Sequence, residues 1–204
     1  MGVKLKLART GDPVLREKCD PVTAAEMETK ELQSFLDAMI DYVNRRGYKG
    51  DTARQDRVRY SGMAANQFGL SKAVIAVDFA IGHSGFSDIH ALINPAIIGH
   101  SHNISINSEG CRSVPCIYGM VPRFEEVQVK SLDRSGNTIE ISAKGKLSVL
   151  LQHEIDHLRG ILFVDRLVDP RKANFVRKGQ IQDYRRNYMT WAQFTDVSSL
   201  TMSV

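Results

Sequence analysis

The order of apolar and polar positions predicts helices toward both ends of the chain and strands between them. Between residues 23 and 46, apolar side chains recur every three or four positions, which is the periodicity of an amphipathic helix. Thr23 and Glu26 have the spacing of a capping box at its start, and Gly47 suits its end. The polar segment 47–60 that follows is predicted to be a surface loop.

Short apolar runs in the middle of the chain predict strands. They cover residues 73–79, 91–98 and 125–131, the last with the alternation of a half-buried strand. The turn-forming segment 133–137 and the run after it complete a hairpin, and residues 146–158 then return to helical spacing. Because strands and helices are segregated along the chain, the pattern favours an α+β fold over a doubly wound parallel sheet.

The composition indicates one globular domain, residues 1–204. A chain of 204 residues that is 43% hydrophobic and 25% charged can bury a site without help from disulfides, which the odd number of three cysteines also disfavours. No apolar run has the length of a membrane-spanning helix, and the first residues lack the apolar stretch of a signal peptide. We therefore expect a cytoplasmic protein with no membrane partner.

The net charge of +4 is concentrated in a basic and aromatic tail that begins at about residue 169. Its cations are Arg171, Lys172, Arg177, Lys178, Arg185 and Arg186. Its apolar positions at helical spacing are Ile181, Tyr184, Tyr188, Trp191 and Phe194. This spacing predicts a helix docked on the core or on a second subunit. Contact with ribosomal RNA is the alternative hypothesis, although such charges usually form a solvated face.

The strongest chemical signal is the segment QHEIDHL at residues 152–158. His153 and His157 are four positions apart, so on a helix they project from one face and can bind the same metal ion. Glu154 lies beside the first ligand and can exchange protons with a water on the metal. Two solvated histidines on an exposed helix are the alternative, which the surrounding apolar residues disfavour because they predict a buried segment.

A catalytic metal site of this kind usually has three protein ligands. Cys111, in the irregular and turn-rich segment EGCRSVP, is the first candidate for the third ligand, and Cys116 is its competitor in the same segment. Cys19 is predicted to be structural. The histidines predicted to be solvated loop residues are His83, His90, His100 and His102.

Three segments together resemble the signature segments of the peptide deformylases. They are YSGMAANQ at residues 60–67, EGCRS at 109–113 and QHEIDH at 152–157, in the order that the family has them. The N-terminal TGDPVLREKCDPVT is also similar to the family's opening, and the likeness covers roughly residues 5–168. It implies antiparallel sheets packed around a central helix that carries the metal motif. Tyr60, Met63 and Arg112 depart from the family's pattern.

The resemblance also implies the chemistry. A ferrous ion, which zinc or another divalent metal can replace, would be bound by Cys111, His153 and His157. The implied reaction removes the formyl group from formyl-methionyl nascent chains where a bacterium or organelle translates. We expect a metal-bound hydroxide to attack the formyl carbon, with Glu154 as general base and acid. The Gln67 side chain and the Arg112 backbone N–H are expected to stabilise the oxyanion.

Substrate contacts are expected around this centre. Val149 and Leu150 share the helix face of His153 and are predicted to line a pocket for the methionine side chain, with an ordinary core role as the alternative. The other residues expected to bind substrate are Gly62, Met63, Glu109 and Gly110. The resemblance leaves Asn66 free to vary.

Two rival functions follow from the same residues. A zinc endopeptidase also uses two histidines and a glutamate, but no histidine follows His157, so it would need an acidic third ligand such as Asp165. A binding protein that has lost catalysis is the second rival, and the intact Glu154 argues against it.

Overall fold

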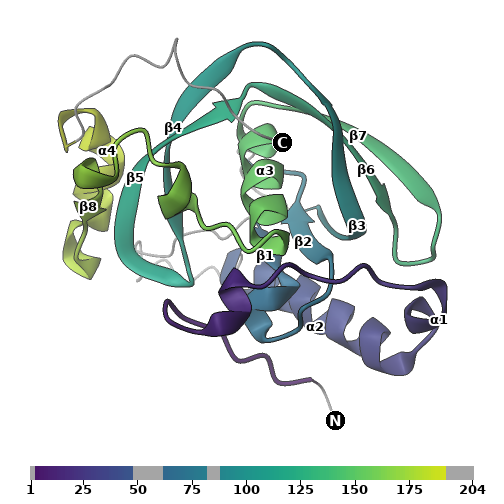
Figure 1. The fold of residues 1–204 in the computed structure, drawn as a ribbon. Helices are drawn as coiled ribbons and strands as arrows, with labels where there is room; N and C mark the ends of the chain where they lie inside the picture. The colour runs from purple at the N-terminus through teal and green to yellow at the C-terminus, as the bar shows by residue number, and fades with distance from the viewer. Residues whose placement is uncertain (1–2, 48–61, 82–87, 192–204) are drawn as a thin grey trace.

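The computed structural model describes residues 3–47, 62–81 and 88–191, which form two antiparallel sheets around a central helix (Figure 1). The larger sheet has the strand order β1-β2-β3-β6-β7, with bounds Gly62–Ala64, Val74–Asp78, Ile89–His100, Glu126–Leu132 and Thr138–Lys144. The smaller sheet has the order β4-β5-β8, with bounds Ile104–Cys111, Val114–Phe124 and Asn174–Phe175. The predicted α+β class, with antiparallel sheets around the helix, is confirmed.

Four helices and five short 3-10 segments complete the described chain. The helices are α1 (Ala24–Met27), α2 (Lys30–Gly47), α3 (Lys146–Leu158) and α4 (Ile181–Trp191). The 3-10 segments are η1 (Pro13–Arg16), η2 (Ala65–Phe68), η3 (Phe163–Arg166), η4 (Pro170–Lys172) and η5 (Lys178–Gln180). Among the described residues, no helix has the length and apolar character needed to cross a membrane.

The central helix α3 is buried on several sides, as its apolar pattern predicts. Leu151 and Ile155 pack in a core cluster with residues of β2, β3 and β6. The polar side chains of Ser148 and Gln152 are buried too, and both are satisfied by the backbone of Phe124 at the end of β5. Ser148 Oγ donates to the Phe124 carbonyl at 2.8 Å, and the Gln152 amide bonds the N–H and the carbonyl of the same residue. These bonds tie α3 to the smaller sheet.

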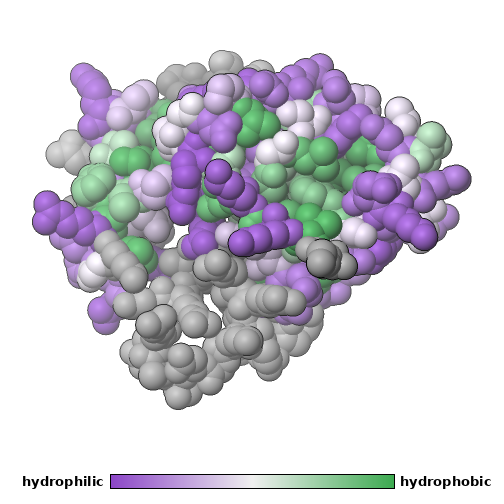
Figure 2. All heavy atoms as spheres, turned by 90° about the horizontal axis from the view of Figure 1, so that it is seen from below, coloured by the Kyte–Doolittle hydropathy of each residue, from purple (hydrophilic) through white to green (hydrophobic). Residues whose placement is uncertain are grey.

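The single helix predicted for residues 23–46 is wrong, because the chain forms two helices there, α1 and α2. The Thr23–Glu26 capping box at the start of α1 is confirmed. The break falls at Thr29, whose hydroxyl donates to the Glu26 carbonyl at 2.7 Å and accepts the Leu32 N–H at 3.3 Å, so it starts a second helix. The helix α2 packs on β2 and β3. Seen from below in Figure 2, apolar side chains form separate patches between polar residues.

The strands predicted at 73–79, 91–98 and 125–131 and the hairpin after them are confirmed as β2, β3, β6 and β7. The irregular segment predicted around Cys111 is wrong in part, because Cys111 ends β4 and β5 begins at Val114, with only a tight turn between them. Glycine permits this pairing, since a Cβ at Gly110 would lie 2.5 Å from the Tyr118 ring across the strands. The predicted loop at 47–60, apart from Gly47 itself, and the positions His83 and Phe194 lie outside the described residues.

Candidate active site

Three metal-binding side chains meet where β4 ends beside α3. The ligand atoms of Cys111, His153 and His157 lie within 4.8 Å of one another, which no other three such side chains in the described ranges do. Cys111 Sγ is 3.2 Å from His157 Nε2, and the two imidazole rings, one helical turn apart, have centroids 5.2 Å apart. One thiolate and two imidazoles form a donor set that suits zinc or ferrous iron and leaves a coordination position open. These residues therefore fit the metal centre that their spacing indicates.

The other two cysteines lie apart from this cluster. Cys116, the competitor for the third ligand, is exposed on β5 with a left-handed φ of 65°, and it lines the cleft without joining the ligand cluster. Cys19 is buried in the core, where burial, followed by Asp20 and Glu17, raises the pKa of its thiol to about 11. A neutral buried thiol agrees with the structural role predicted for Cys19.

The remaining histidines and Asp165 are not placed to bind this metal. His90 and His100 lie on β3 rather than in the predicted loops, although both are exposed as expected. His102 is exposed in the bend after β3. Asp165, the acidic ligand that an endopeptidase would need, pairs with Arg16 and accepts the Leu162 N–H. Asp165 is therefore not in position to act as the third metal ligand that the endopeptidase hypothesis needs.

A buried network of charges orients His153. Its Nδ1 is 2.8 Å from Oε2 of Glu109, which leaves Nε2 for the metal. Arg123, only 1% exposed, holds Glu109 through two hydrogen bonds of 2.7 and 3.0 Å and reaches Asp156 at 2.5 Å. Asp156 also accepts two bonds from Arg166, at 2.6 and 2.7 Å. Positive and negative groups therefore alternate, and each buried charge of this network has partners.

Glu109, predicted to bind substrate, is engaged by other side chains of the site. It lines the cleft, but both of its carboxylate oxygens are engaged, by Arg123 and by His153. Burial raises the pKa of Glu109, but the Arg123 guanidinium outweighs this and holds it at about 2. The ionised carboxylate thus holds the His153 ring in its orientation through Nδ1. Arg123 and Asp156 were not predicted, although a lone arginine in the apolar run MVPRF signals a buried ion pair.

Glu154 is a buried carboxylate at the floor of the cleft. Its side chain projects from α3 one position after His153, and its Oε2 has no hydrogen-bond partner within the described chain. Burial raises the pKa of Glu154 to about 7, against the opposing effect of His153. A Cβ at Gly62 would lie 2.9 Å from both Glu154 Oε1 and Leu150 Cδ1. A larger residue at position 62 would therefore clash with the Glu154 carboxylate in its present position. Such a group can accept and return a proton near neutral pH.

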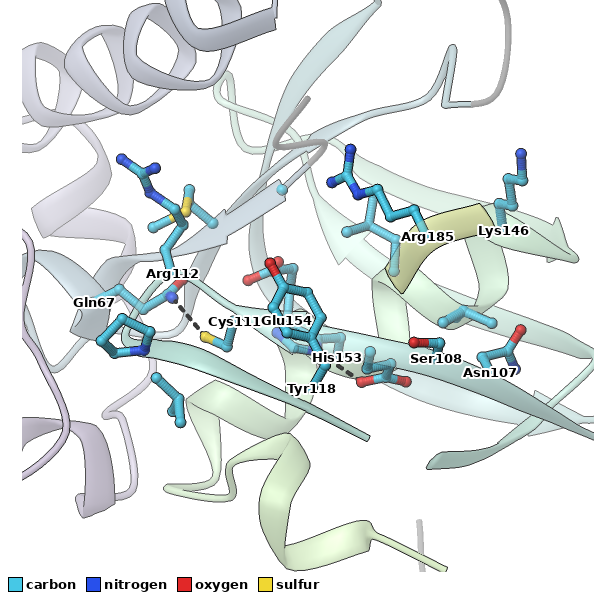
Figure 3. Close-up of a pocket in the computed structure, with 18 of the residues that line it drawn as sticks. Gln67, Asn107, Ser108, Cys111, Arg112, Tyr118, Lys146, His153, Glu154 and Arg185 are labelled. Atoms are coloured by element: carbon cyan, nitrogen blue, oxygen red, sulfur yellow. Dashed lines mark hydrogen bonds and ion pairs between the residues drawn. The ribbon is translucent and has the colours of Figure 1, made fainter. Parts of the chain in front are cut away.

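The Gln67 amide is aimed at the cluster from η2. Its Oε1 accepts the Ala64 N–H at 2.8 Å, which fixes the side chain to its own turn. Its Nε2 donates to Ser113 Oγ at 3.2 Å and lies 3.4 Å from Cys111 Sγ (Figure 3). Arg112 follows Cys111 directly in the turn between β4 and β5 and lines the same cleft. The Gln67 amide is therefore close to the ligand cluster, and the Arg112 backbone N–H stays a prediction.

Asn66 makes a buried contact that the resemblance did not imply. Its side chain is fully buried, and its Nδ2 donates to the His157 carbonyl at 2.6 Å. The bond joins η2 to the last turn of α3, the turn that carries a metal ligand. A sequence pattern does not show this contact, because 91 residues separate its two partners.

A cleft of about 550 Å³ opens above these residues, a size ordinary for a small-ligand site. Its lining includes the predicted substrate residues Gly62, Met63, Gly110, Val149 and Leu150. Strands β1 and β4 each lie at the edge of their sheet in the described chain, and both contribute to the lining. Their backbones can therefore hydrogen-bond an extended peptide, and Val149 and Leu150 offer it an apolar surface.

Comparison with known proteins agrees with this geometry. A family model described as polypeptide deformylase matches residues 4–173. A peptide deformylase from Halothermothrix orenii is 41% identical over 164 residues, which cover 80% of this chain and 94% of the relative. The Met-Ala-Ser-bound class I type b enzyme from Acinetobacter baumannii has a TM-score of 0.70 at 33% identity, covering 82% of this chain and 100% of its own. The Thermotoga maritima peptide deformylase has a TM-score of 0.66 at 30% identity, covering 81% of this chain and 98% of its own. The chain therefore belongs to the polypeptide deformylase family, whose enzymes remove the formyl group from peptide N-termini.

Proposed function

We propose that the chain hydrolyses the N-terminal formamide of formyl-methionyl nascent polypeptides and that Glu154 transfers the protons. The observation that carries this proposal is a buried carboxylate beside the Cys–His–His cluster at the floor of a cleft, whose Oε2 has no hydrogen-bond partner among the described residues. We also propose that residues 1–204 form one catalytic domain, in which the tail from about residue 169 adds α4 to the cleft.

The metal is proposed to be ferrous iron, held by Cys111, His153 and His157. Its identity rests on the resemblance to the family, since the same thiolate and imidazole donors also accept zinc. When bound, the ion supplies Lewis-acid activation of water and of the formyl oxygen. The chain's own part is to orient the ligands, and the contact between Glu109 and His153 Nδ1 does this for one of them.

Glu154 is proposed to move the proton twice. Its carboxylate takes a proton from the attacking water and later gives it to the leaving amine, which departs as a free N-terminus. A pKa near 7 suits both steps, because the group is then neither too weak a base nor too weak an acid at neutral pH. The absence of a hydrogen-bond partner for Oε2 within the described residues keeps one oxygen available to water.

The oxyanion is proposed to be stabilised by the Gln67 amide and the Arg112 backbone N–H. In the structure, Nε2 of Gln67 already points toward Cys111 Sγ. We expect Gln67→Ala to lower kcat about 10²- to 10³-fold, because the donor acts most strongly as charge develops on the formyl oxygen. The thermal midpoint should fall as well, since the Ala64 N–H loses its acceptor.

Asn66→Ala is the matched control for that loss of stability. It removes a buried bond to the His157 carbonyl and should lower the free energy of unfolding by about 1–3 kcal/mol. We expect its folded fraction to retain most of its turnover, with kcat and the thermal midpoint measured on both variants. If Gln67→Ala lost only as much turnover as Asn66→Ala at equal loss of stability, the oxyanion role of Gln67 would be excluded.

The formyl group is proposed to be selected by shape. Its carbon carries only a hydrogen atom, and the floor of the cleft is tightly packed, as the short distances from a Cβ at Gly62 show. The test compares formyl-Met-Ala-Ser with acetyl-Met-Ala-Ser at equal concentrations. We expect formate release from the first and little acetate release from the second. Equal hydrolysis of the two amides would contradict a site shaped for the formyl group.

The cellular setting is proposed from the substrate. Formyl-methionyl chains arise during translation, which places the activity in the cytoplasm of a bacterium or in a translating organelle. A contact with the ribosome through the basic tail is part of the same proposal. Arg171 is paired with Asp169, so the exposed cations Arg177 and Arg186 are the better candidates for that contact.

A further inference from the structure

The tail helix α4 forms part of the cleft wall. The Tyr184 side chain is 1% exposed, and its hydroxyl is 2.7 Å from Ser108 Oγ on β4. The Tyr184 ring also lies 5.1 Å from the Tyr118 ring on β5, measured between centroids. With α4 anchored in this way, Arg185 and Tyr188 line the same cleft as the metal cluster. The matched family region ends at residue 173, so this wall lies outside it.

The exposed charge at one end of the cleft is positive. Arg185 on α4 and Lys146 at the start of α3 are both exposed, and neither forms an ion pair with a residue that the structure describes. Figure 3 shows both on the side of the cleft where Ser108 lies, whereas Arg112 lies on the opposite side. This end therefore has two cations that solvent and a ligand can reach.

No acidic side chain that the structure describes in the cleft neutralises this end. Glu109 is engaged by Arg123, and Glu154 is buried at the floor. Asp183 on α4 accepts a hydrogen bond from Asn187 at 2.7 Å and does not line the cleft. The two cations thus lack a carboxylate partner within the described residues, and a peptide in the cleft can supply one.

We propose that Arg185 and Lys146 bind a carboxylate on the third residue of the formylated peptide and so favour acidic substrates. Ser108 precedes Cys111 by three positions on β4, about 10 Å along an extended strand. An extended peptide that runs beside β4, with its formyl group at Cys111, brings its third residue to Ser108 and the two cations. The inference rests on the deformylation proposed above.

The carboxylate has two possible sources, an acidic side chain or the free C-terminus of a short peptide. The test therefore compares three substrates: formyl-Met-Ala-Glu-amide, formyl-Met-Ala-Gln-amide and formyl-Met-Ala-Gln with a free carboxylate. We expect kcat/KM to be about threefold to tenfold higher for either carboxylate than for the uncharged amide, the range for two exposed ion pairs. The preference is expressed as the ratio of kcat/KM for a carboxylate-bearing substrate to kcat/KM for the uncharged amide. Raising the salt to 0.5 M should reduce this ratio, because exposed charges are screened.

The double variant Arg185→Ala with Lys146→Ala should bring the ratio to about one. The matched control is Arg186→Ala with Lys144→Ala, which removes two exposed cations from neighbouring positions outside the cleft. The control should keep the ratio of the unmodified protein. Equal kcat/KM for all three substrates, or a ratio that survives in the first double variant, would overturn the proposal. A ratio lost equally in the control would also overturn it.

Binding of the deformylated products separates this inference from the proposed function. The dissociation constants of Met-Ala-Glu-amide and Met-Ala-Gln-amide should show the same preference, measured by calorimetry on the metal-loaded protein. If neither formylated peptide were hydrolysed but the binding preference remained and depended on Arg185 and Lys146, the proposed function would fail and the carboxylate site would stand. Equal dissociation constants would overturn the site whatever the rate of hydrolysis.

Discussion

Glu154→Gln is expected to lower kcat about 10²- to 10⁴-fold, the range for loss of a general acid–base group, and to leave the metal content unchanged. The glutamine amide keeps the size of the side chain but cannot accept the proton of the attacking water. Because Oε2 has no hydrogen-bond partner among the described residues, the substitution breaks no bond there and should not lower the thermal midpoint. Turnover of formyl-Met-Ala-Ser, elemental analysis and a melting curve on the same preparation check these results.

The matched control for this variant is Glu140→Gln, on the exposed side of β7. It makes the same chemical change far from the cleft and should leave turnover as it is. A less than tenfold effect of Glu154→Gln on kcat would remove Glu154 from the mechanism. A large loss of thermal stability with normal turnover in the folded fraction would assign the residue a structural role.

Cys111→Ser is expected to abolish or severely weaken metal binding and with it the activity. The Sγ atom lies in the one cluster of three ligand atoms found among the described residues, and a serine hydroxyl stays protonated at neutral pH and is a poor ligand. Removing a residue that only hydrogen-bonds a metal ligand costs about 10- to 100-fold in metal affinity, so removing the ligand itself should cost more. Competition with a chelator measures the affinity, and formate release measures the activity.

The other two cysteines provide matched controls. Cys116→Ser changes an exposed thiol at the rim of the cleft and should leave the metal content unchanged. Cys19→Ser buries a hydroxyl in the core and should lower the thermal midpoint while the metal stays bound. Full metal occupancy and activity in Cys111→Ser would refute the ligand assignment, and metal loss in Cys116→Ser would move it to the competitor.

Local periodicity was enough to predict much of the fold. The strands β2, β3, β6 and β7 and the helix α3 lie where alternation, turn residues and helical spacing place them. The break between α1 and α2 was missed, because it depends on hydrogen bonds of the Thr29 hydroxyl rather than on the apolar pattern. The pairing of β4 with β5 was missed because their turn residues and glycines resemble a loop, whereas the close contact of Gly110 with Tyr118 is a tertiary feature.

The site was predictable to the extent that its residues are close in sequence or belong to recognised segments. His153, Glu154 and His157 follow from helical spacing alone, whereas the choice of Cys111 over Cys116 needed the segment EGCRS and the resemblance that it carries. The partners in contacts between distant residues were not predictable. Arg123 and Asp156 behind Glu109, and the bond from Asn66 to the end of α3, connect segments whose pairing only the fold determines.

The most direct test of the central claim is to follow the oxygen of the attacking water. Iron-loaded protein, purified without oxygen, is given formyl-Met-Ala-Ser in water enriched in oxygen-18, and the products are analysed by mass spectrometry. Attack at the formyl carbon predicts one labelled oxygen in formate and an unlabelled Met-Ala-Ser with a free amine. A labelled carboxylate on formyl-methionine, with no formate released, would show cleavage of the internal peptide bond and contradict the account.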